Sequence, residues 1–188
     1  IVQLPHSIGT RRQDLINFCV ENNIQICRQD WDAHETSWDF CQNELIRLKH
    51  TSGLIKDSFA SYIDEWTKKF HQLHSNEEEL NRQFIEIYGL QDELTPDVPY
   101  NEVTILQQGE IKIEGNHIKF QPDVVINQLI SYAVGCWMGR YRLDKKGLHI
   151  AHPNPSKEEV CTYEYNGEPF TIDDDGNIPL LPYDCPFD

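Results

Sequence analysis

Side chains that could bind a metal ion are densest between residues 30 and 39. The group contains Asp30, Asp32, His34, Glu35 and Asp39. Carboxylates and imidazoles are ordinary metal ligands. Trp31 and Trp38 are interleaved with them, however, and large aromatic rings usually anchor a loop by burial. We therefore predict a solvated loop pinned by its aromatic rings, and no metal site.

Two other patterns suggest metal chemistry only weakly. The run Asp173-Asp174-Asp175-Gly176-Asn177 resembles a calcium loop, but its glycine is misplaced and the closing Glu is absent, which favours a surface turn. None of the six cysteines forms a C-x-x-C pair, and the closely spaced His71 and His74 have no Cys nearby in sequence. Free, reduced thiols are the expectation.

One short cationic and aromatic cluster, Arg140-Tyr141-Arg142, is the candidate nucleic-acid site, and Lys145-Lys146 follows it closely. Such residues can hold a phosphate or stack on a base. The alternative is structural, since cations favour the C-terminal end of a helix through its dipole.

The overall charge argues against strong DNA binding. The 188 residues include 16 Lys and Arg against 31 Asp and Glu, a net charge of -15. Because cationic side chains drive duplex binding, the chain by itself should bind DNA weakly or not at all, unless it has a local basic face. The sequence starts at Ile1-Val2-Gln3-Leu4-Pro5, which resembles neither a signal peptide nor a membrane anchor. We therefore expect a piece of a larger cytoplasmic protein.

Hydrophobic periodicity predicts three helices. The first runs from Arg11 to Asn23, with Asn22-Asn23 as its stop, and turns Leu15, Ile16, Cys19 and Val20 inward. The second runs from Ile55 to Tyr88 and ends at Gly89. Ser75 and Glu78 have the spacing of a capping box, so a hairpin broken at Ser75 is the alternative to one long rod. The third runs from Pro122 to about Tyr141 and is apolar on most sides, which predicts a central buried helix.

Short extended segments complete the prediction. A hairpin is expected over residues 110–120 around Gly115-Asn116, preceded by an apolar run over 103–106, and a second over 161–172 around Asn166-Gly167. The fold class is mainly α with small β-hairpins. The expected segments are an N-terminal helix with a Trp-rich loop (1–54), a helical core with an inserted hairpin (55–144), and a C-terminal hairpin with a loose Pro-rich tail (145–188), all in one domain.

Three passages resemble a known family in order and spacing. They are ELNRQFIEIYGLQDEL (79–94), DWDAHETSWDF (30–40) and SYAVGCWMGRY (131–141). Together they resemble the C-terminal half of the PglX-type adenine-specific DNA methyltransferases of the BREX phage-resistance system. The resemblance covers most of residues 24 to 144.

The resemblance implies that the parent protein transfers a methyl group from S-adenosylmethionine to adenine N6, marking host DNA in phage defence. That reaction needs a glycine-rich turn for the cofactor and an Asp/Asn-Pro-Pro-aromatic loop for the flipped base. Neither occurs in this sequence, and Asn154-Pro155-Ser156-Lys157 lacks the second proline and the ring, so it should be a turn. We therefore expect no catalytic or cofactor-binding residue here, and a segment that braces the other methyltransferase domains, supports DNA specificity or docks other defence proteins.

Two alternatives remain open. The first is an acidic helical module that binds a basic protein partner, for which an exposed apolar groove would be evidence. The second is part of a fused restriction endonuclease and methyltransferase, which would require Asp30, Asp32 and Glu35 to converge. A membrane partner is not expected.

Overall fold

A computed structural model describes residues 9–174 and 176–179. These residues form four α-helices, one 3-10 helix and two β-hairpins, which confirms the predicted α+β class. The chain divides into two compact units, Ile1–Trp31 with Lys49–Pro122, and Asp32–Leu48 with Asp123–Asp188. We call these unit 1 and unit 2. Each of the three segments predicted from sequence is one continuous stretch of chain, whereas each unit combines two stretches that are distant in sequence.

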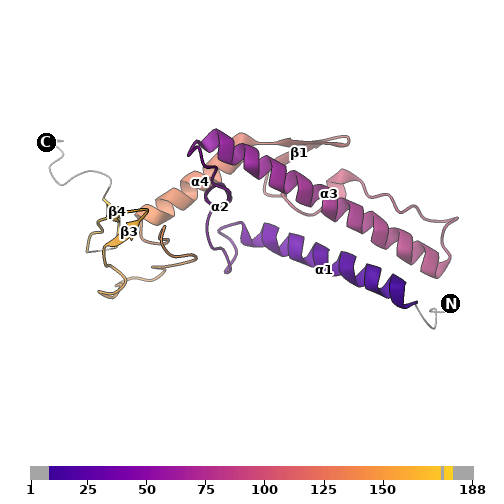
Figure 1. The fold of residues 1–188 in the computed structure, drawn as a ribbon, viewed down its shortest axis with the longest axis horizontal. Coiled ribbons are helices and arrows are strands. Elements are labelled where there is room, and N and C mark those ends of the chain that lie inside the picture. Colours follow the sequence, from indigo (N-terminus) through magenta and orange to yellow (C-terminus); the bar gives the residue numbers. More distant parts are fainter. Residues whose placement is uncertain (1–8, 175, 180–188) are drawn as a thin grey trace. The chain divides into compact units, whose positions relative to one another are not determined.

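Unit 1 is built on two antiparallel helices, α1 (Thr10–Asp32, of which Asp32 belongs to unit 2) and α3 (Ile55–Tyr88), which lie side by side (Figure 1). An ion pair of 2.8 Å between Arg12 and Glu86 joins the start of α1 to the end of α3. The buried residues of α3 recur every three or four positions and form one stripe. They are Ser58, Tyr62, Trp66, Phe70, Leu73 and Asn76.

The prediction of one long rod over Ile55–Tyr88 is confirmed, and Ser75 starts no helix. Ser75 lies exposed in the middle of α3, and Glu78 instead accepts a hydrogen bond from the backbone of Val98. The predicted stop at Gly89 is also confirmed, because Gly89 has φ 68° and ψ 38°, and Leu90 donates to the carbonyl of Ile85 at 2.9 Å.

The predicted end of the first helix at Asn22-Asn23 is wrong, because α1 continues to Asp32. The reason lies in α3, where the buried Asn76 donates from Nδ2 to Oδ1 of Asn22 at 2.9 Å and of Asn23 at 2.7 Å. These side chains are thus engaged across the helix pair rather than with their own backbone, where they would favour a turn. Ile16 and Cys19 are buried as predicted, whereas Leu15 and Val20 are exposed.

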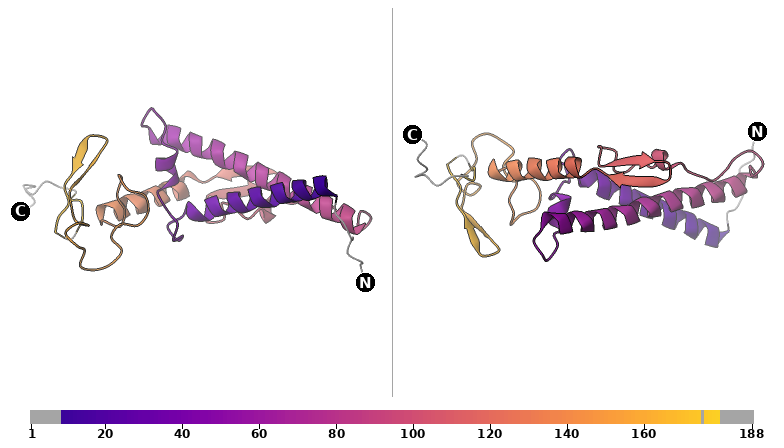
Figure 2. Two further views of the ribbon diagram at one scale, coloured as in Figure 1. Left: turned by 60° about the horizontal axis from the view of Figure 1, so that its bottom comes forward. Right: turned by 90° about the horizontal axis from the view of Figure 1, so that it is seen from above.

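The rest of unit 1 covers α3. After η1 (Tyr100–Glu102), Val103, Ile105 and Leu106 of the apolar run 103–106 are buried, but the run forms no strand. The predicted hairpin is confirmed as β1 (Ile111–Glu114) and β2 (His117–Phe120), paired antiparallel with Glu114 opposite His117. The hairpin lies alongside α3 (Figure 2), where the rings of Phe120 and Tyr62 meet edge to face at 5.8 Å.

Unit 2 contains α2 (Glu44–Arg47), α4 (Pro122–Trp137, of which Pro122 belongs to unit 1) and the hairpin of β3 (Tyr163–Tyr165) with β4 (Glu168–Phe170). The second hairpin is thus confirmed, and Asn166 and Gly167 both have positive φ, as a type I′ turn requires. The predicted loose tail at 180–188 lies outside the described residues.

The prediction that α4 is buried on most sides is wrong. Ile130, Val134 and Trp137 are 39% to 53% exposed, and the buried face consists of Val125, Tyr132, Gly135 and Cys136. The helix also ends at Trp137, earlier than expected. Gly135 in α4 and Gly139 just after it do permit a close approach, but by segments that are not helical. A Cβ at Gly135 would lie 2.6 Å from the Tyr141 ring, and one at Gly139 would lie 2.5 Å from the carbonyl oxygen of Gly176.

Replacing Asn76 with alanine should destabilise unit 1, and replacing the neighbouring Ser75 should not. Asn76→Ala removes the buried donor shared by two asparagine oxygens, which costs about 1–3 kcal/mol of unfolding free energy. Ser75→Ala changes an exposed mid-helix residue to a better helix former, so the unfolding free energy should stay the same or rise slightly. Urea unfolding followed by circular dichroism measures both. Destabilisation by Ser75→Ala of the size lost at a helix cap would contradict the continuous helix.

Candidate nucleic-acid interface

The candidate interface is a loop of unit 2 that we call the basic loop, residues 140–149. It contains four of the 16 Lys and Arg of the chain against one Asp, a local charge of +3 within a chain of -15. This is the kind of local basic face that the overall charge conceals.

Backbone hydrogen bonds hold the neck of the basic loop. Tyr141 and Leu148 form an isolated antiparallel bridge, and the amide of His149 donates to the carbonyl of Arg140 at 2.7 Å. Near the tip, the amide of Gly147, at φ 81°, donates to the carbonyl of Cys41 at 2.8 Å. The basic loop is therefore fixed at its neck and at Gly147, next to its tip.

The structure separates the three residues of the predicted cluster. Tyr141 is 3% exposed and packs in the core of unit 2, against Phe40 at 5.4 Å and Tyr132 at 5.1 Å between ring centroids. Arg142 makes two hydrogen bonds to Asp144, of 2.8 and 2.7 Å, and lies over the ring of Tyr163 at 4.3 Å. Arg140 is exposed.

The exposed cations of the basic loop are thus Arg140, Lys145 and Lys146. The sequence pattern placed Lys145 and Lys146 close to the cluster but missed that Tyr141 is buried. The signal was available in part, because alternating residues of an extended segment point to opposite sides, so a buried Tyr141 leaves its neighbours facing away from the core.

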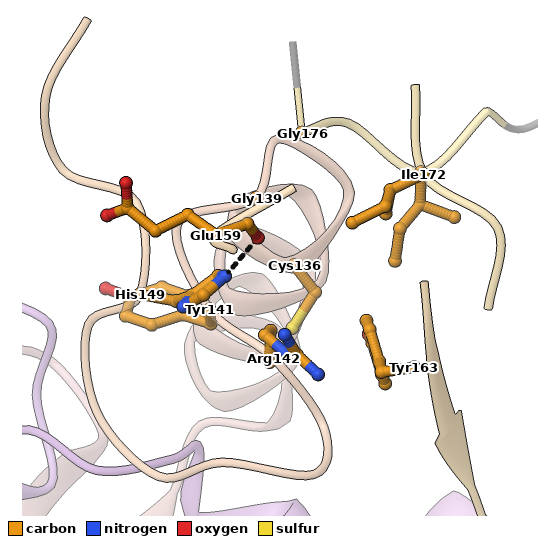
Figure 3. Close-up of a pocket in the computed structure, with 10 residues that line it drawn as sticks. Cys136, Gly139, Tyr141, Arg142, His149, Glu159, Tyr163, Ile172 and Gly176 are labelled. Atoms are coloured by element: carbon orange, nitrogen blue, oxygen red, sulfur yellow. Dashed lines mark hydrogen bonds between the residues drawn. The ribbon is translucent and has the colours of Figure 1, made fainter. Parts of the chain in front are cut away.

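Beneath the basic loop, a small pocket of about 10 Å³ shows how its base is packed. Figure 3 shows Arg142 beside the Tyr163 ring and His149 hydrogen-bonded through Nε2 to the carbonyl of Glu159, at 2.8 Å. The volume is close to the least that one water needs, so the pocket is no ligand site. Its lining instead fixes the base of the loop.

Burial sets the proton affinities in this core. It raises the pKa of the Cys136 thiol to about 11. Burial first, and then the neighbouring Glu35 carboxylate, raise the pKa of the Tyr141 phenol to about 12. Burial also raises the pKa of Tyr132. All three groups are neutral near pH 7, so none is an activated nucleophile or base.

The polar residues 30–39 serve structural contacts. Asp30 accepts from the backbone of Leu106 at 3.0 Å, and Asp32 accepts from Ser37 Oγ at 2.7 Å. Within residues 9–174 and 176–179, no group of three or more His, Cys, Asp or Glu side chains is placed to hold a metal ion. The predicted aromatic anchoring of this segment is wrong for its tryptophans: Trp31 is 59% and Trp38 is 91% exposed, while Phe40 alone is buried.

Other predicted features have local roles. Residues 173–177 close as a hydrogen-bonded turn in which Asn177 donates to Asp173 Oδ1 at 2.7 Å; Asp175 lies outside the described residues. Asn154 adopts φ 60°, as expected of a turn. The five cysteines that the structure describes are free, and Cys185 lies beyond them. No described helix combines the length and the apolar character needed to cross a membrane.

Unit 1 has a polar groove between α1 and α3, with a volume of about 310 Å³. Its lining is mainly amide side chains together with Lys68 and Lys69. Both lysines are paired, Lys68 with Asp64 at 2.6 Å and Lys69 with Glu65 at 3.0 Å. Because its cations are neutralised locally, this groove is a weaker candidate for phosphate than the basic loop.

Alkaline pH should destabilise unit 2. Cys136 and Tyr141 ionise at usual values of 9.0 and 10.0 in an unfolded chain but only at about 11 and about 12 in the fold. Since the folded state keeps these protons longer, the associated stability is complete below pH 9 and is lost as the pH rises towards 12. Urea unfolding across this range, with tyrosinate absorbance, measures the loss.

Tyr141→Phe is the matched control, because it keeps the ring in the core and removes one titrating group. Its stability should fall less steeply over the same pH range. A wild-type unfolding free energy that does not change between pH 9 and 12 would contradict this account of the core.

Comparison with known proteins identifies two similar proteins. No protein-family model matches the chain. The chain is 35% identical over 161 residues to "Adenine-specific methyltransferase BrxX" of Escherichia coli O9:H4 (strain HS), a match over 84% of this chain and 13% of that protein. It is 34% identical over 160 residues to "Adenine-specific methyltransferase PglX" of Lacticaseibacillus casei (strain Zhang), over 82% of this chain and 12% of that protein. The chain therefore spans about one eighth of the length of these relatives, and it is similar to one segment of each of these two adenine-specific methyltransferases.

Proposed function

We propose that the chain is a non-catalytic segment of a site-specific adenine-N6 DNA methyltransferase of a phage-defence system, and that it contacts the DNA backbone through the basic loop. Two relatives that carry the name of this activity support the first part. The cofactor turn and the base-holding loop of the reaction are missing from the sequence, which supports a non-catalytic role. S-adenosylmethionine would then bind elsewhere in the parent protein, which acts in the cytoplasm.

The geometry of the basic loop carries the proposal of DNA contact. Three exposed cations, Arg140, Lys145 and Lys146, lie on a loop whose neck and tip are fixed by backbone hydrogen bonds. A fixed loop loses little conformational entropy when its side chains meet phosphates. Asp144 is already occupied by Arg142, so the tip keeps its positive charge.

Removing the two lysines of the tip should weaken DNA binding and its salt dependence. Each phosphate contact contributes about 0.9 to the negative slope of log affinity against log salt. Lys145→Ala with Lys146→Ala should therefore make this slope less steep by about 2, equally for different DNA sequences. Fluorescence anisotropy of a labelled duplex at low and moderate salt measures it on the whole 188-residue chain.

Lys112→Ala with Lys119→Ala is the matched control. These lysines face each other across the β1–β2 hairpin, are exposed, and belong to unit 1, so the double variant changes the net charge by the same amount. Equal losses of affinity in the two double variants would mean that net charge alone matters, and would contradict a role of the basic loop.

One observation favours the alternative, a protein-docking module. Along α1, Val20, Ile24 and Trp31 are 38%, 56% and 59% exposed and recur at helical spacing on one side of the helix. If the chain binds no duplex even at low salt, this surface becomes the better basis for its function, and the partner would be another segment of the methyltransferase or another defence protein.

A further inference from the structure

The indole of Trp38 is 91% exposed, although the loop that carries it is held firmly. Ser37 and Phe40, on either side, are buried. Ser37 Oγ donates to Asp32 at 2.7 Å and accepts from the backbone amide of Asp39 at 3.1 Å, and the amide of Phe40 donates to the carbonyl of Ser37 at 3.3 Å. The exposure of Trp38 is therefore set by a built turn.

The fold gives this ring no packing role. Trp66, by comparison, is 1% exposed in the core of unit 1. Exposing a large aromatic ring to water is unfavourable, so stacking on another ring is favoured. Because the turn already fixes the backbone that carries the ring, little conformational entropy is lost when the ring stacks. Aromatic faces of this kind stack on nucleobases in proteins that bind single strands.

The turn of Trp38 adjoins the basic loop within unit 2. The carbonyl of Cys41 accepts the amide of Gly147 at 2.8 Å, and a Cβ at Gly147 would lie 3.7 Å from the carbonyl oxygen of Phe40. Trp38 precedes Cys41 by three residues, which span at most about 11 Å. Lys145 and Lys146 come directly before Gly147. The stacking ring and the two ammonium groups therefore belong to neighbouring loops.

We propose that these two loops form a binding site for an unpaired nucleotide, in which Trp38 stacks on the base and Lys145 and Lys146 hold flanking phosphates. The phosphate contacts rest on the proposed function of the basic loop; the stacking contact is independent of it. Because bases inside a duplex already stack on each other, the site selects single-stranded or bulged DNA over paired DNA.

The test compares a labelled single strand, the matching duplex, and the same duplex with one unpaired base, all at low salt. The chain should bind the single strand and the bulged duplex more tightly than the plain duplex. Trp38→Ala should weaken single-strand binding about tenfold or more, and change plain-duplex binding little. Because Trp38 is so exposed, circular dichroism should show an unchanged fold.

Two further variants separate stacking from structure. Trp38→Phe keeps an aromatic face, so it should retain most of the affinity but lose the part of the tryptophan fluorescence that single-stranded DNA quenches. Trp31→Ala is the control, because Trp31 is also exposed but belongs to unit 1. It should leave the affinity for every DNA unchanged.

The outcomes distinguish the two proposals. If Trp38→Ala binds the single strand as tightly as the wild type, the stacking site is overturned and the basic loop is unaffected. If Lys145→Ala with Lys146→Ala changes nothing while Trp38→Ala weakens binding, the role of the basic loop is overturned and the stacking contact stands. If the wild type binds none of the three DNAs, both proposals fall.

Discussion

The amide of Asn76 is the contact on which the arrangement of α1 and α3 depends. It is buried, and it donates to both Asn22 and Asn23 across the helix pair. Apolar side chains tolerate a shift between two helices, but a shift by one turn would leave three amides without their partners, which is costly in a buried site. With the register fixed, the same buried stripe of α3 also receives later segments of unit 1 in fixed places, Tyr100 against Phe70 and Phe120 against Tyr62.

In unit 2, the absence of a side chain at Gly135 has a comparable effect. The ring of Tyr141 lies 2.6 Å from the position that a Cβ at Gly135 would take, and there it completes a core with Phe40 and Tyr132. Because Tyr141 is anchored in this core, the basic loop starts from a fixed point. Arg142 is hydrogen-bonded to Asp144 and lies over the Tyr163 ring, whereas Arg140 is exposed to solvent. The contact that builds the core thus also decides which cations are available.

Local sequence signals predicted what depends on local geometry. The periodicity of α3, its stop at Gly89 and both hairpins were confirmed, because each depends on residues close in sequence. Asn22-Asn23 was wrongly predicted to end the helix, because the donor that binds Asn23 is 53 residues away and no local pattern shows it. Trp38 was expected to be buried because its type usually is, whereas its exposure follows from the turn that Ser37 makes with Asp32. In the candidate site, the position of the cations was predicted but not the burial of Tyr141, which requires a partner at Gly135.

The negative net charge of the chain and the positive charge of the basic loop together determine where DNA could approach. Beyond about 8 Å at physiological salt, the charges of exposed groups are largely screened, so a phosphate senses only the side chains near it. In the proposed contact, acidic surface elsewhere would disfavour non-specific approach of DNA, and the loop with its local charge of +3 would be the place where a strand approaches. Such a contact is weak on its own. The relatives are about eight times as long as the segment that this chain matches, so a longer protein of this kind would have room for other DNA contacts. Those contacts would raise the effective concentration of DNA at the basic loop. A weak contact in a defined place could then discriminate between paired and unpaired DNA.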